Sequence, residues 1–537
     1  MADKSGTPPG GERKLYARKS SGLVRTIGVF GAMVFGVHCI SLSSSGLIPF
    51  SWVAGVWPGS SIIGVLTVAM IFCLFHAYTY ATIGATMPRS AADYTMASRT
   101  LSAPLAFAAS WTLVIFSAMV AGSLIAWIPK TAVPTLFRTM GIVLGNDGML
   151  KVADWSVTVP GIILIGSIGT LVTFGTMILP TRTILRILEV GFILGLLAWA
   201  ILYFQLIAPR DAFPVAWDKF MGEGSYAGRI ALAKANGMVT NPNVALMSLA
   251  GLIMGFWIFY GYYIPTFFAG EVKQAESTLI AGSWSSLLVT WAIFVVAAIL
   301  LQRLVPLEWI AAESYLSNIG YEGGAMPWII FYAAILKPSF PLLLLVALGW
   351  IYTLVNLAQT YFFYCSRIIF AWSFDRLIPE KVCYIHPKLR SPIIAIAIIA
   401  VIAEIGVIDA ATGGVMGAQL NFVFFAVCTQ LVPVAAITLF PFLKPDLFEN
   451  ASAFVRRRLG KVPVITIVGA ITLAYLLWML VASFMFPAVG GRIGVGTLVT
   501  LAAFIVSGII VFYIARGVRL KKEGIDINWT FKSIPPV

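Results

Sequence analysis

Residues 255–265 read GFWIFYGYYIP, which places two glycines and a proline inside an aromatic and uncharged stretch. Pro265 has no N–H to donate to the carbonyl group four residues earlier, which belongs to Gly261, so a helix should open there. The alternative is a simple proline kink among packed aromatic side chains. The stretch lies within residues 244–269, an apolar run long enough to cross a membrane. We therefore expect an interrupted membrane span.

A second apolar run, residues 26–50, contains a similar weak point. Residues 38–46 read HCISLSSSG, and such serine side chains compete with the helical backbone for hydrogen bonds. The alternative is a contact between two helices through small side chains, which membrane helices commonly use. We expect this first span to be interrupted near Ser43.

The composition of the chain is that of an integral membrane protein. Apolar residues make up 59% of the 537 residues, charged residues only 11%, and the mean hydropathy is +0.92. A soluble protein carries about 25% charged residues, because water covers its surface. A scan for apolar runs of about 20 residues predicts twelve transmembrane helices, and no alternating pattern indicates a β-barrel. The expected spans are 26–50, 60–86, 102–128, 158–179, 183–208, 244–269, 278–304, 328–363, 391–409, 416–442, 464–487 and 493–516.

The positive charges orient these spans. Of the 36 Lys and Arg residues, 26 fall on the side that holds both termini and 10 on the other side, which predicts cytoplasmic termini. The basic excess lies in short loops and tails, as contact with anionic lipids requires, and not in a stripe for nucleic acid. We expect a multi-pass protein of the plasma membrane. Five scattered cysteines without a CxxC spacing indicate neither a disulfide framework nor a zinc site.

The interrupted spans are the first and the sixth, so they occupy corresponding places in consecutive halves of five helices each. An odd number of helices per half turns the second half upside down in the membrane. Interrupted helices at matching positions of inverted halves are typical of a transporter's midplane site. The expected organisation is a disordered basic cytoplasmic tail at 1–25, a first five-helix repeat at 26–208, an extracellular loop at 209–243, a second, inverted five-helix repeat at 244–442, two peripheral helices at 443–516 and a cytoplasmic tail at 517–537.

Three polar stretches on the expected outer side are longer than turns, namely 129–157, 209–243 and 305–327. Within the second, the segment from Tyr226 to Ala235 is expected to form a short interfacial helix over the outer mouth. No low-complexity tract follows the Gly- and Pro-rich first dozen residues.

Three sequence motifs lie on the expected cytoplasmic side, after the second, sixth and eighth spans. Residues 270–273 (GEVK) resemble the G-E-x-K signature after the sixth helix, although Gln274-Ala275 stands where Asn-Pro is usual. Residues 87–94 (MPRSAADY) resemble the P-x-S-G-G-x-Y loop after the second helix, with two alanines in place of the glycine pair. A third motif after the eighth span matches in the spacing of Ser366-Arg367, Ala371, Asp375, Pro379, His386-Pro387 and Pro392.

With these three motifs the chain resembles the amino acid–polyamine–organocation superfamily of permeases. The resemblance extends over most of residues 20–440 and implies an all-α integral membrane protein. Ten helices would form two inverted five-helix repeats, the LeuT-like fold, with discontinuous helices 1 and 6 and with helices 11 and 12 at the periphery. The resemblance also implies secondary active transport of amino acids or related amines by alternating access. The first span departs most from the family, because it lacks the G-S-G-I/V signature that grips the substrate carboxylate in many members.

An unwound helix exposes N–H groups that attract a carboxylate and carbonyl groups that attract an ammonium. The middles of spans 1, 3 and 6 contain no Asp, Glu, Lys or Arg, which favours neutral, apolar amino acids; polyamines and nucleobases are alternative substrates, and a substrate sensor is an alternative function. The resemblance places an aromatic gate at Trp257, for which packing is the alternative role. The candidate substrate-binding residues are Ser43, Ser44, Ser45 and Gly46 for the carboxylate, and Gly255, Trp257, Phe259 and Gly261 for the wall and the ammonium side.

The coupling ion is open between H⁺ and Na⁺, with a narrow preference for the proton. His38 and His76 lie in apolar spans and could carry protons, and a neutral core histidine is the alternative for each. A sodium site between helices 1 and 8 needs oxygen ligands, for which Thr353, Asn356 and Thr360 are candidates. Hydrogen bonds between helices are the more common use of such residues.

Charged residues near the cytoplasmic ends of the spans could form an inner gate. The candidates are Arg89, Glu271, Arg367 and Asp375, which could pair across the rim; solvated loop charges are the alternative. No resident metal or cofactor is expected besides a coupling ion.

Motifs of other functional classes are missing from the sequence. It has no HExxH, no GxxxxGK[ST] and no GxSxG, so no intramembrane enzyme is indicated. A channel would show a filter motif and oligomeric symmetry, whereas this chain has a pseudo-repeat within itself. The expected partners are a small-molecule substrate and the lipid bilayer, and the oligomeric state stays open.

Overall fold

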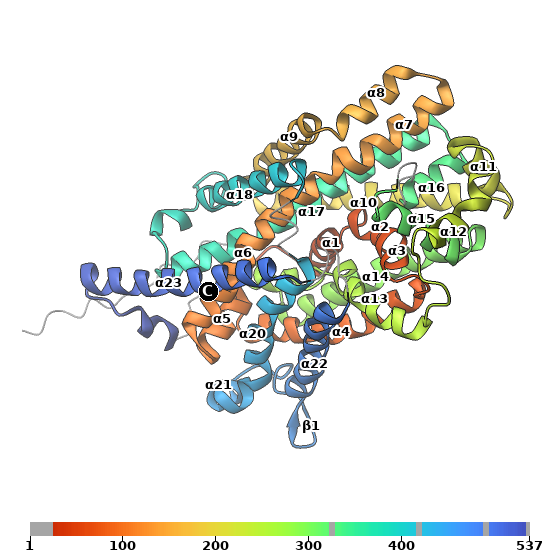
Figure 1. Ribbon diagram of the computed structural model, residues 1–537. Coiled ribbons are helices and arrows are strands. Elements are labelled where there is room, and N and C mark those ends of the chain that lie inside the picture. Colours follow the sequence, from red (N-terminus) through yellow and green to blue (C-terminus); the bar gives the residue numbers. More distant parts are fainter. Residues whose placement is uncertain (1–24, 322–327, 415–420, 487–492, 533–537) are drawn as a thin grey trace, which may run out of the picture.

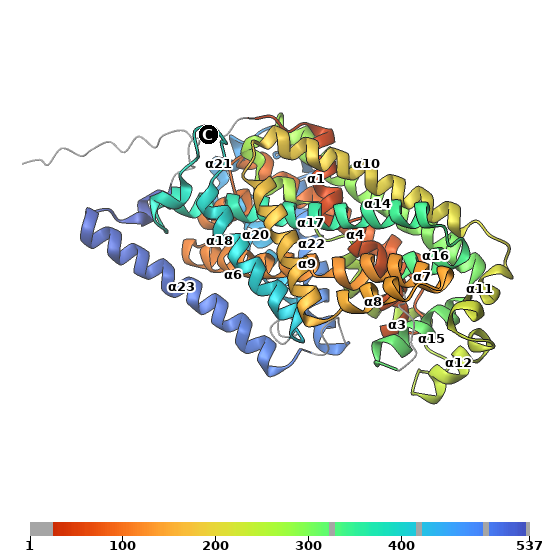
Figure 2. The ribbon, with the colours of Figure 1, turned by 90° about the horizontal axis from the view of Figure 1, so that it is seen from above.

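A computed structural model describes residues 25–321, 328–414, 421–486 and 493–532. Within them the chain is mostly helical, and its long helices form one bundle (Figure 1 and Figure 2). Ten helices of this part are long and apolar enough to cross a membrane, and a bent pair in the first span brings the number to eleven. The long helices are α4 (Ile62–Thr86), α6 (Ala103–Ile125) continued by α7 (Val133–Leu144), α9 (Val159–Met177), α10 (Thr181–Leu206), α14 (Ala275–Leu304), α17 (Phe340–Phe374), α18 (Ile393–Ala411), α20 (Phe422–Leu443), α22 (Val464–Met485) and α23 (Val495–Glu523).

Shorter elements connect these helices. At the start of several helices, a polar side chain just before the apolar run caps the helix. The Ser61 hydroxyl accepts the Gly64 N–H at the start of α4, at 3.1 Å, and the Asn243 side chain accepts the Leu246 N–H at the start of α13, also at 3.1 Å. Such caps satisfy N–H groups that lack a partner within the helix.

The shorter elements are α5 (Ala92–Thr100), α8 (Asp147–Ser156), α11 (Ala212–Met221), α12 (Ser225–Ala235), α13 (Val244–Ile258), α15 (Leu307–Asn318), α16 (Ile329–Leu336), α21 (Pro445–Glu449), the 3₁₀ helices η5 (Glu380–Cys383) and η6 (Ile527–Lys532), and the two-residue antiparallel strands β1 (Arg458–Leu459) and β2 (Val462–Pro463).

The first span is interrupted where the serine-rich stretch predicts it. Helix α1 (Val29–Ile40) ends, Ser41 takes a positive φ of 70°, and the helix resumes at Ser44. The second part passes through α2 (Ser44–Ile48), the π-helical turn η1 (Pro49–Val53) and α3 (Ala54–Val56), and its axis is bent by 46° from that of α1. The predicted interruption near Ser43 is confirmed.

The sixth span is interrupted more severely. Helix α13 ends at Ile258, and Gly261 takes a φ of 122°, which favours glycine. The chain then continues as the 3₁₀ helices η3 (Ile264–Phe267) and η4 (Ala269–Glu271), with Pro265 in the first turn of η3. The predicted opening at Gly261 is confirmed, and this span does not return to an α-helix before α14.

The connecting segments gather at two ends of the bundle. At one end, Ile27 before α1 pairs with Val272 after η4 in a parallel β-bridge. At the other end, the Ser61 N–H donates to the Ser248 hydroxyl at 2.9 Å. Each end joins segments that the predicted topology places on the same side of the membrane. We call the first the inner end and the second the outer end, after that topology.

Residues 129–157 differ from the expected polar loop. The π-helical turn η2 (Ile128–Ala132) and α7 carry the third span onward to Leu144, and α8 packs back against α7. Lys130, which lies just past the predicted end of the span at 128, directs its ammonium group to the carbonyl of Ala410 at 2.7 Å. Its charge is therefore compatible with a position inside the helix.

The outer segments 209–243 and 305–327 are more structured than expected. The helix predicted from Tyr226 to Ala235 is present as α12 (Ser225–Ala235), but α11 and α15 were not anticipated. A buried ion pair between Arg229 and Glu313 joins α12 to α15. These helices lie together beside α2 and α3 in Figure 1.

The C-terminal part also extends beyond the prediction. Helix α23 continues to Glu523, past the predicted end of the span at 516, and lies along one edge of the bundle in Figure 2. The following turn η6 folds back, with Ile527 buried and the Phe531 ring 5.0 Å from the guanidinium carbon of Arg99. Parts of several expected elements lie outside the described residues. They are 1–24 of the N-terminal tail, 322–327 of the third outer stretch, 416–420 of the tenth span, residue 487 at the end of the eleventh span, the loop 488–492 that follows it, and 533–537 of the C-terminal tail.

Candidate functional site

The two interruptions lie directly against each other. A Cβ atom at Gly261 would lie 2.6 Å from the carbonyl carbon of Cys39 and 2.7 Å from its sulfur. Only a residue without a side chain therefore fits between the broken sixth span and the end of α1. This contact brings both interruptions to one place inside the bundle.

Serine hydroxyl groups hold the first interruption. Ser41 Oγ accepts the N–H of Ser44 at 3.1 Å and lies 3.1 Å from Ser43 Oγ, while Ser45 donates to the carbonyl of Ile40. All of these residues are buried. The hydroxyl groups thus replace part of the backbone bonding that the helix gives up at this point.

Neighbouring helices also contact the first interruption. The indole N–H of Trp199 in α10 donates to the Leu42 carbonyl at 3.0 Å. A Cβ atom at Gly46 would lie 2.5 Å from the Trp199 ring. Gly46 therefore allows close contact with α10, whereas Ser43, Ser44 and Ser45 form the start of α2.

The aromatic residues of the sixth span divide between the site and the surrounding core. Trp257 stacks between Trp52, with ring centroids 4.9 Å apart, and Phe422 of α20, at 5.0 Å. Phe259 is fully buried, and its ring centroid is 6.4 Å from that of Phe294 in α14. A Cβ atom at Gly255 would lie 2.5 Å from the Ala69 methyl group, so Gly255 serves the packing of α13 on α4.

Both candidate histidines are buried and have an uncharged hydrogen-bond partner. His38 Nε2 lies 2.7 Å from the carbonyl oxygen of Leu188 in α10. His76 Nδ1 lies 2.7 Å from the hydroxyl of Tyr262, directly after Gly261. The second contact connects α4 to the interruption of the sixth span.

The polar residues of α17 bond mainly to one another and to neighbouring helices. Asn356 donates to Gln359 at 2.6 Å, and Gln359 donates to Thr176 at 2.7 Å. Thr353 and Thr360 donate to carbonyl groups of their own helix. In the described part of the chain, no group of three or more His, Cys, Asp or Glu residues could hold a metal ion.

A buried ion pair closes the inner end around the sixth span. Arg367 Nε lies 2.7 Å from Glu271 Oε1, its Nη2 lies 3.2 Å from Oε2, and both side chains are at most 2% exposed. Thr181 at the start of α10 donates to the same carboxylate at 3.2 Å. The backbone carbonyl of Glu271 accepts the N–H groups of Thr26 and Ile27. Glu271 thus ties together segments next to spans 1, 5, 6 and 8.

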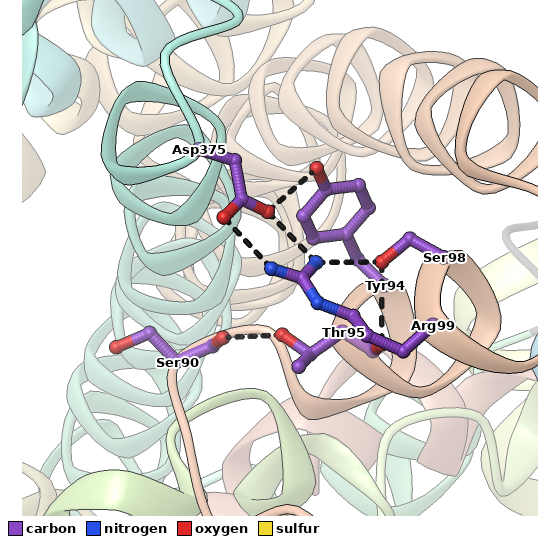
Figure 3. Close-up of polar contacts among 6 residues, drawn as sticks. All are labelled: Ser90, Tyr94, Thr95, Ser98, Arg99 and Asp375. Carbon is purple, nitrogen blue, oxygen red and sulfur yellow. Dashed lines mark hydrogen bonds and ion pairs between the residues drawn. The ribbon is translucent and has the colours of Figure 1, made fainter. Parts of the chain in front are cut away.

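A second buried ion pair lies nearby and includes a residue that sequence reasoning missed (Figure 3). Arg99 donates to both carboxylate oxygens of Asp375 at 2.8 Å, and Tyr94 donates to Asp375 at 3.0 Å. Burial, followed by the charge of Asp375, raises the pKa of Tyr94 well above its usual value, so its hydroxyl stays protonated. Arg89 donates to the Pro88 carbonyl at 2.9 Å and belongs to neither of these two pairs.

One feature of the sequence indicates that Arg99 should have a partner. Arg99 lies between two apolar runs, where an unpaired charge next to the membrane is costly, so a partner of opposite charge was to be expected. The partner itself was not deducible, because Asp375 is 276 residues away.

Two comparisons with known proteins identify the family of this chain. The model of a family described as amino acid permease matches residues 22–514. The branched-chain amino acid permease BcaP of Bacillus subtilis (strain 168) is 22% identical over 379 residues, which are 70% of this chain and 72% of that protein. The chain therefore belongs to the amino acid permease family of the amino acid–polyamine–organocation superfamily, whose members are membrane transporters.

Proposed function

We propose that the protein is a secondary active transporter that carries neutral, apolar amino acids across the plasma membrane by alternating access. Branched-chain amino acids are the first substrates to test, because the similar permease of Bacillus subtilis is named for them. In this proposal the chain forms twelve spans in two inverted five-helix repeats with two peripheral helices, and both termini are cytoplasmic.

The observation that carries this proposal is the contact between the interruptions at Cys39 and Gly261. Two broken helices that meet inside a bundle present N–H groups and carbonyl groups without exposing a charged side chain to lipid. Such groups suit the carboxylate and the ammonium of an amino acid. Ser43, Ser44 and Ser45 are our candidates for the carboxylate side.

The surroundings of the interruptions support an apolar side chain in the substrate. The buried neighbours on the sixth span are the aromatic residues Phe259, Tyr260 and Tyr262. Trp257, stacked between Trp52 and Phe422, lies toward the outer end and is our candidate for an outer gate. At the inner end, we assign the corresponding role to the buried ion pairs.

Uptake by the purified full chain in proteoliposomes tests this proposal. We expect saturable uptake and counterflow of radiolabelled L-leucine, with competition by L-isoleucine and L-valine but not by L-lysine or L-glutamate. Transport of putrescine or uracil in place of leucine would favour the alternative substrates. Binding of leucine without flux would favour a sensor.

A pair of glycine variants connects this test to the interruptions. Gly261→Ala should reduce leucine counterflow at least about tenfold, because a methyl group would meet Cys39 and alanine disfavours a φ of 122°. Gly517→Ala is the matched control, since a methyl group there meets no atom within 4 Å. Equal activity of the two variants would contradict a role for the close contact.

A further inference from the structure

Asp93, in the first turn of α5, is a buried acid that takes part in neither inner ion pair. Asp93 is 4% exposed, and its Oδ1 atom has no hydrogen-bond partner among the described residues. By contrast, Asp375 and Glu271 each have an arginine partner at this end. A buried carboxylate without a counterion is unfavourable, so this group has a reason to bind a proton.

Asp93 lines a small cavity between α5, α6 and α20. The volume is about 10 Å³, which is room for about one water molecule. Ser110 of α6 and Thr429 of α20 add hydroxyl groups to a wall that is otherwise apolar, with residues such as Leu113 and Pro433. A water molecule there could pass a proton to or from the carboxyl group.

The charged and titratable groups around Asp93 leave it without a cationic partner among the described residues. On α5 itself, Tyr94 and Arg99 are engaged with Asp375 of α17. Helix α4, which packs against α5, contributes the buried side chain of Tyr80. The elements η3, α6 and α20 bring no charged side chain to the cavity, and the Lys532 ammonium of η6 lies over the Trp529 ring, 4.0 Å from its centroid.

The proton affinity of this group falls in the physiological range. Burial raises the pKa of Asp93 to about 7, while the backbone N–H groups of Tyr94 and Asp93 act in the opposite direction. The carboxyl group is therefore neutral below this pH and charged above it.

The segment that leads into α5 is fastened to the broken sixth span. The N–H of Ala91 donates to the carbonyl of Phe267 at 2.7 Å, and Ser90 forms a β-bridge with Phe268. From the other side, Thr266 donates to the backbone carbonyl of Tyr80 at 3.0 Å. A change in the packing of α5 therefore reaches η3 through direct backbone contacts.

We propose that Asp93 is a proton-binding site of the transporter, and that release of its proton loosens α5 between α6 and α20 so that η3 can move and the inner end can open. This inference rests on the transport function proposed above. The step is the transfer of a proton from the carboxyl group to water in the cavity, which leaves a carboxylate and a hydronium ion, and the reverse transfer restores the closed packing.

Leucine counterflow into proteoliposomes, measured with the same pH on both sides of the membrane, tests the proposal. With equal pH the result does not depend on the orientation in which the full chain is inserted. Between pH 6 and pH 8 the charged fraction of such a group rises about tenfold, so we expect the wild-type rate to rise by a similar factor. Asp93→Asn cannot release a proton and should show a rate that changes less than about twofold over this range. A variant profile parallel to that of the wild type would overturn the proposal, as would a wild-type rate that falls with pH.

Thr429→Val supplies a second readout that a purely structural role of Asp93 would not move. The substitution keeps the volume but removes a hydroxyl group from the cavity wall, so the carboxylate is less well solvated and the midpoint of the pH profile should shift upward. An unchanged midpoint would contradict the proton-binding site.

Infrared difference spectroscopy on the purified protein separates this inference from the proposed function. We expect a protonated-carboxyl band at pH 6 that disappears at pH 8 in the wild type and is missing from Asp93→Asn. A titrating band in a protein that neither binds nor transports leucine would retain the proton site and reject the proposed substrate. Leucine transport without such a band would reject the proton site alone.

Discussion

The inner and outer ends of the molecule are held together by different interactions. At the inner end, two arginine–carboxylate pairs are buried. The pair of Arg367 and Glu271 lies among segments next to spans 1, 5, 6 and 8, and the pair of Arg99 and Asp375 joins α5 to the end of α17. On the outer side of its interruption, the sixth span is held by stacked rings, with Trp257 between Trp52 and Phe422. The outer end also contains a buried ion pair, but that pair joins the loop helices α12 and α15 to each other.

This difference has consequences for how each end can open. Removing one partner of a buried ion pair strongly lowers the free energy of unfolding, because the remaining charge stays in a medium of low polarity. Stacked rings lose contact area gradually and carry no net charge, so their contribution is smaller and independent of pH. We therefore expect the inner end to respond to charge and pH, and the outer end to respond to side-chain size.

The largest expected effect comes from breaking the inner pair between Arg367 and Glu271. Arg367→Ala should lower the free energy of unfolding by about 3–5 kcal/mol, because it leaves a buried carboxylate without its partner. Chemical unfolding of the purified protein in detergent measures this change. The double variant Glu271→Gln with Arg367→Met should recover most of the loss, and a loss below about 1 kcal/mol in the single variant would contradict the contrast.

The pH dependence of stability sharpens the comparison at the same end. The folded-state pKa of Asp93, about 7, lies above the ordinary value of 3.8, so the folded protein binds this proton more tightly than the unfolded chain. The stabilisation is present at low pH and is lost as pH rises toward 7. Between pH 5 and pH 8 we expect a loss of about 2–3 kcal/mol from this group.

Unfolding of Asp93→Asn over the same pH range measures this contribution. The variant should lack that part of the pH dependence and should be more stable than the wild type at pH 8. A Trp257 variant should keep the wild-type pH dependence, since no charge at the outer stack titrates with it. Identical pH dependence of wild type and Asp93→Asn would remove Asp93 from the comparison.

A smaller effect is expected at the outer stack. Trp257→Ala removes two ring contacts and should lower the free energy of unfolding by about 1–3 kcal/mol, as aromatic pairs each contribute about 0.5–1.5 kcal/mol beyond burial. Trp257→Phe should retain more than half of that contribution. If Trp257→Ala costs as much as Arg367→Ala, the two ends do not differ in the way described.

The smallest effect is expected for an exposed ion pair of the outer side. Arg138 and Asp154 join α7 to α8 at 2.7 Å, with side chains 38% and 69% exposed. Arg138→Ala should change the free energy of unfolding by about 0.5 kcal/mol or less, because water solvates the remaining charge. A loss of several kcal/mol would show that burial is not what distinguishes the inner pairs.

Sequence reasoning was most successful where a residue acts on its own backbone. Pro265 and Gly261 act on the helix that contains them, and the serines after Ile40 bond within a few residues. The interruptions of both spans were predictable for this reason. The continuation of the third span through Lys130 was not, because the ammonium group depends on the Ala410 carbonyl in another helix.

The candidate site was predictable only in part. Glu271 and Arg367 were recognised as a possible inner gate from motifs, and they pair with each other. Asp375 was recognised as well, but its partner Arg99 was missed. Three of the four candidates, Glu271, Arg367 and Asp375, take part in buried ion pairs, but the choice of partners needs the folded arrangement of distant segments.

By itself, the sequence determined that this protein crosses a membrane with many helices and that two of them are broken. Those properties follow from hydropathy over about 20 residues and from proline, glycine and serine acting on nearby backbone groups. Only the tertiary structure decided that the interruptions touch at Cys39 and Gly261 and that Asp93 has no counterion among the residues that the structure describes. The physical reason is that burial and pairing depend on which distant segments pack together, and no local pattern of residues specifies that.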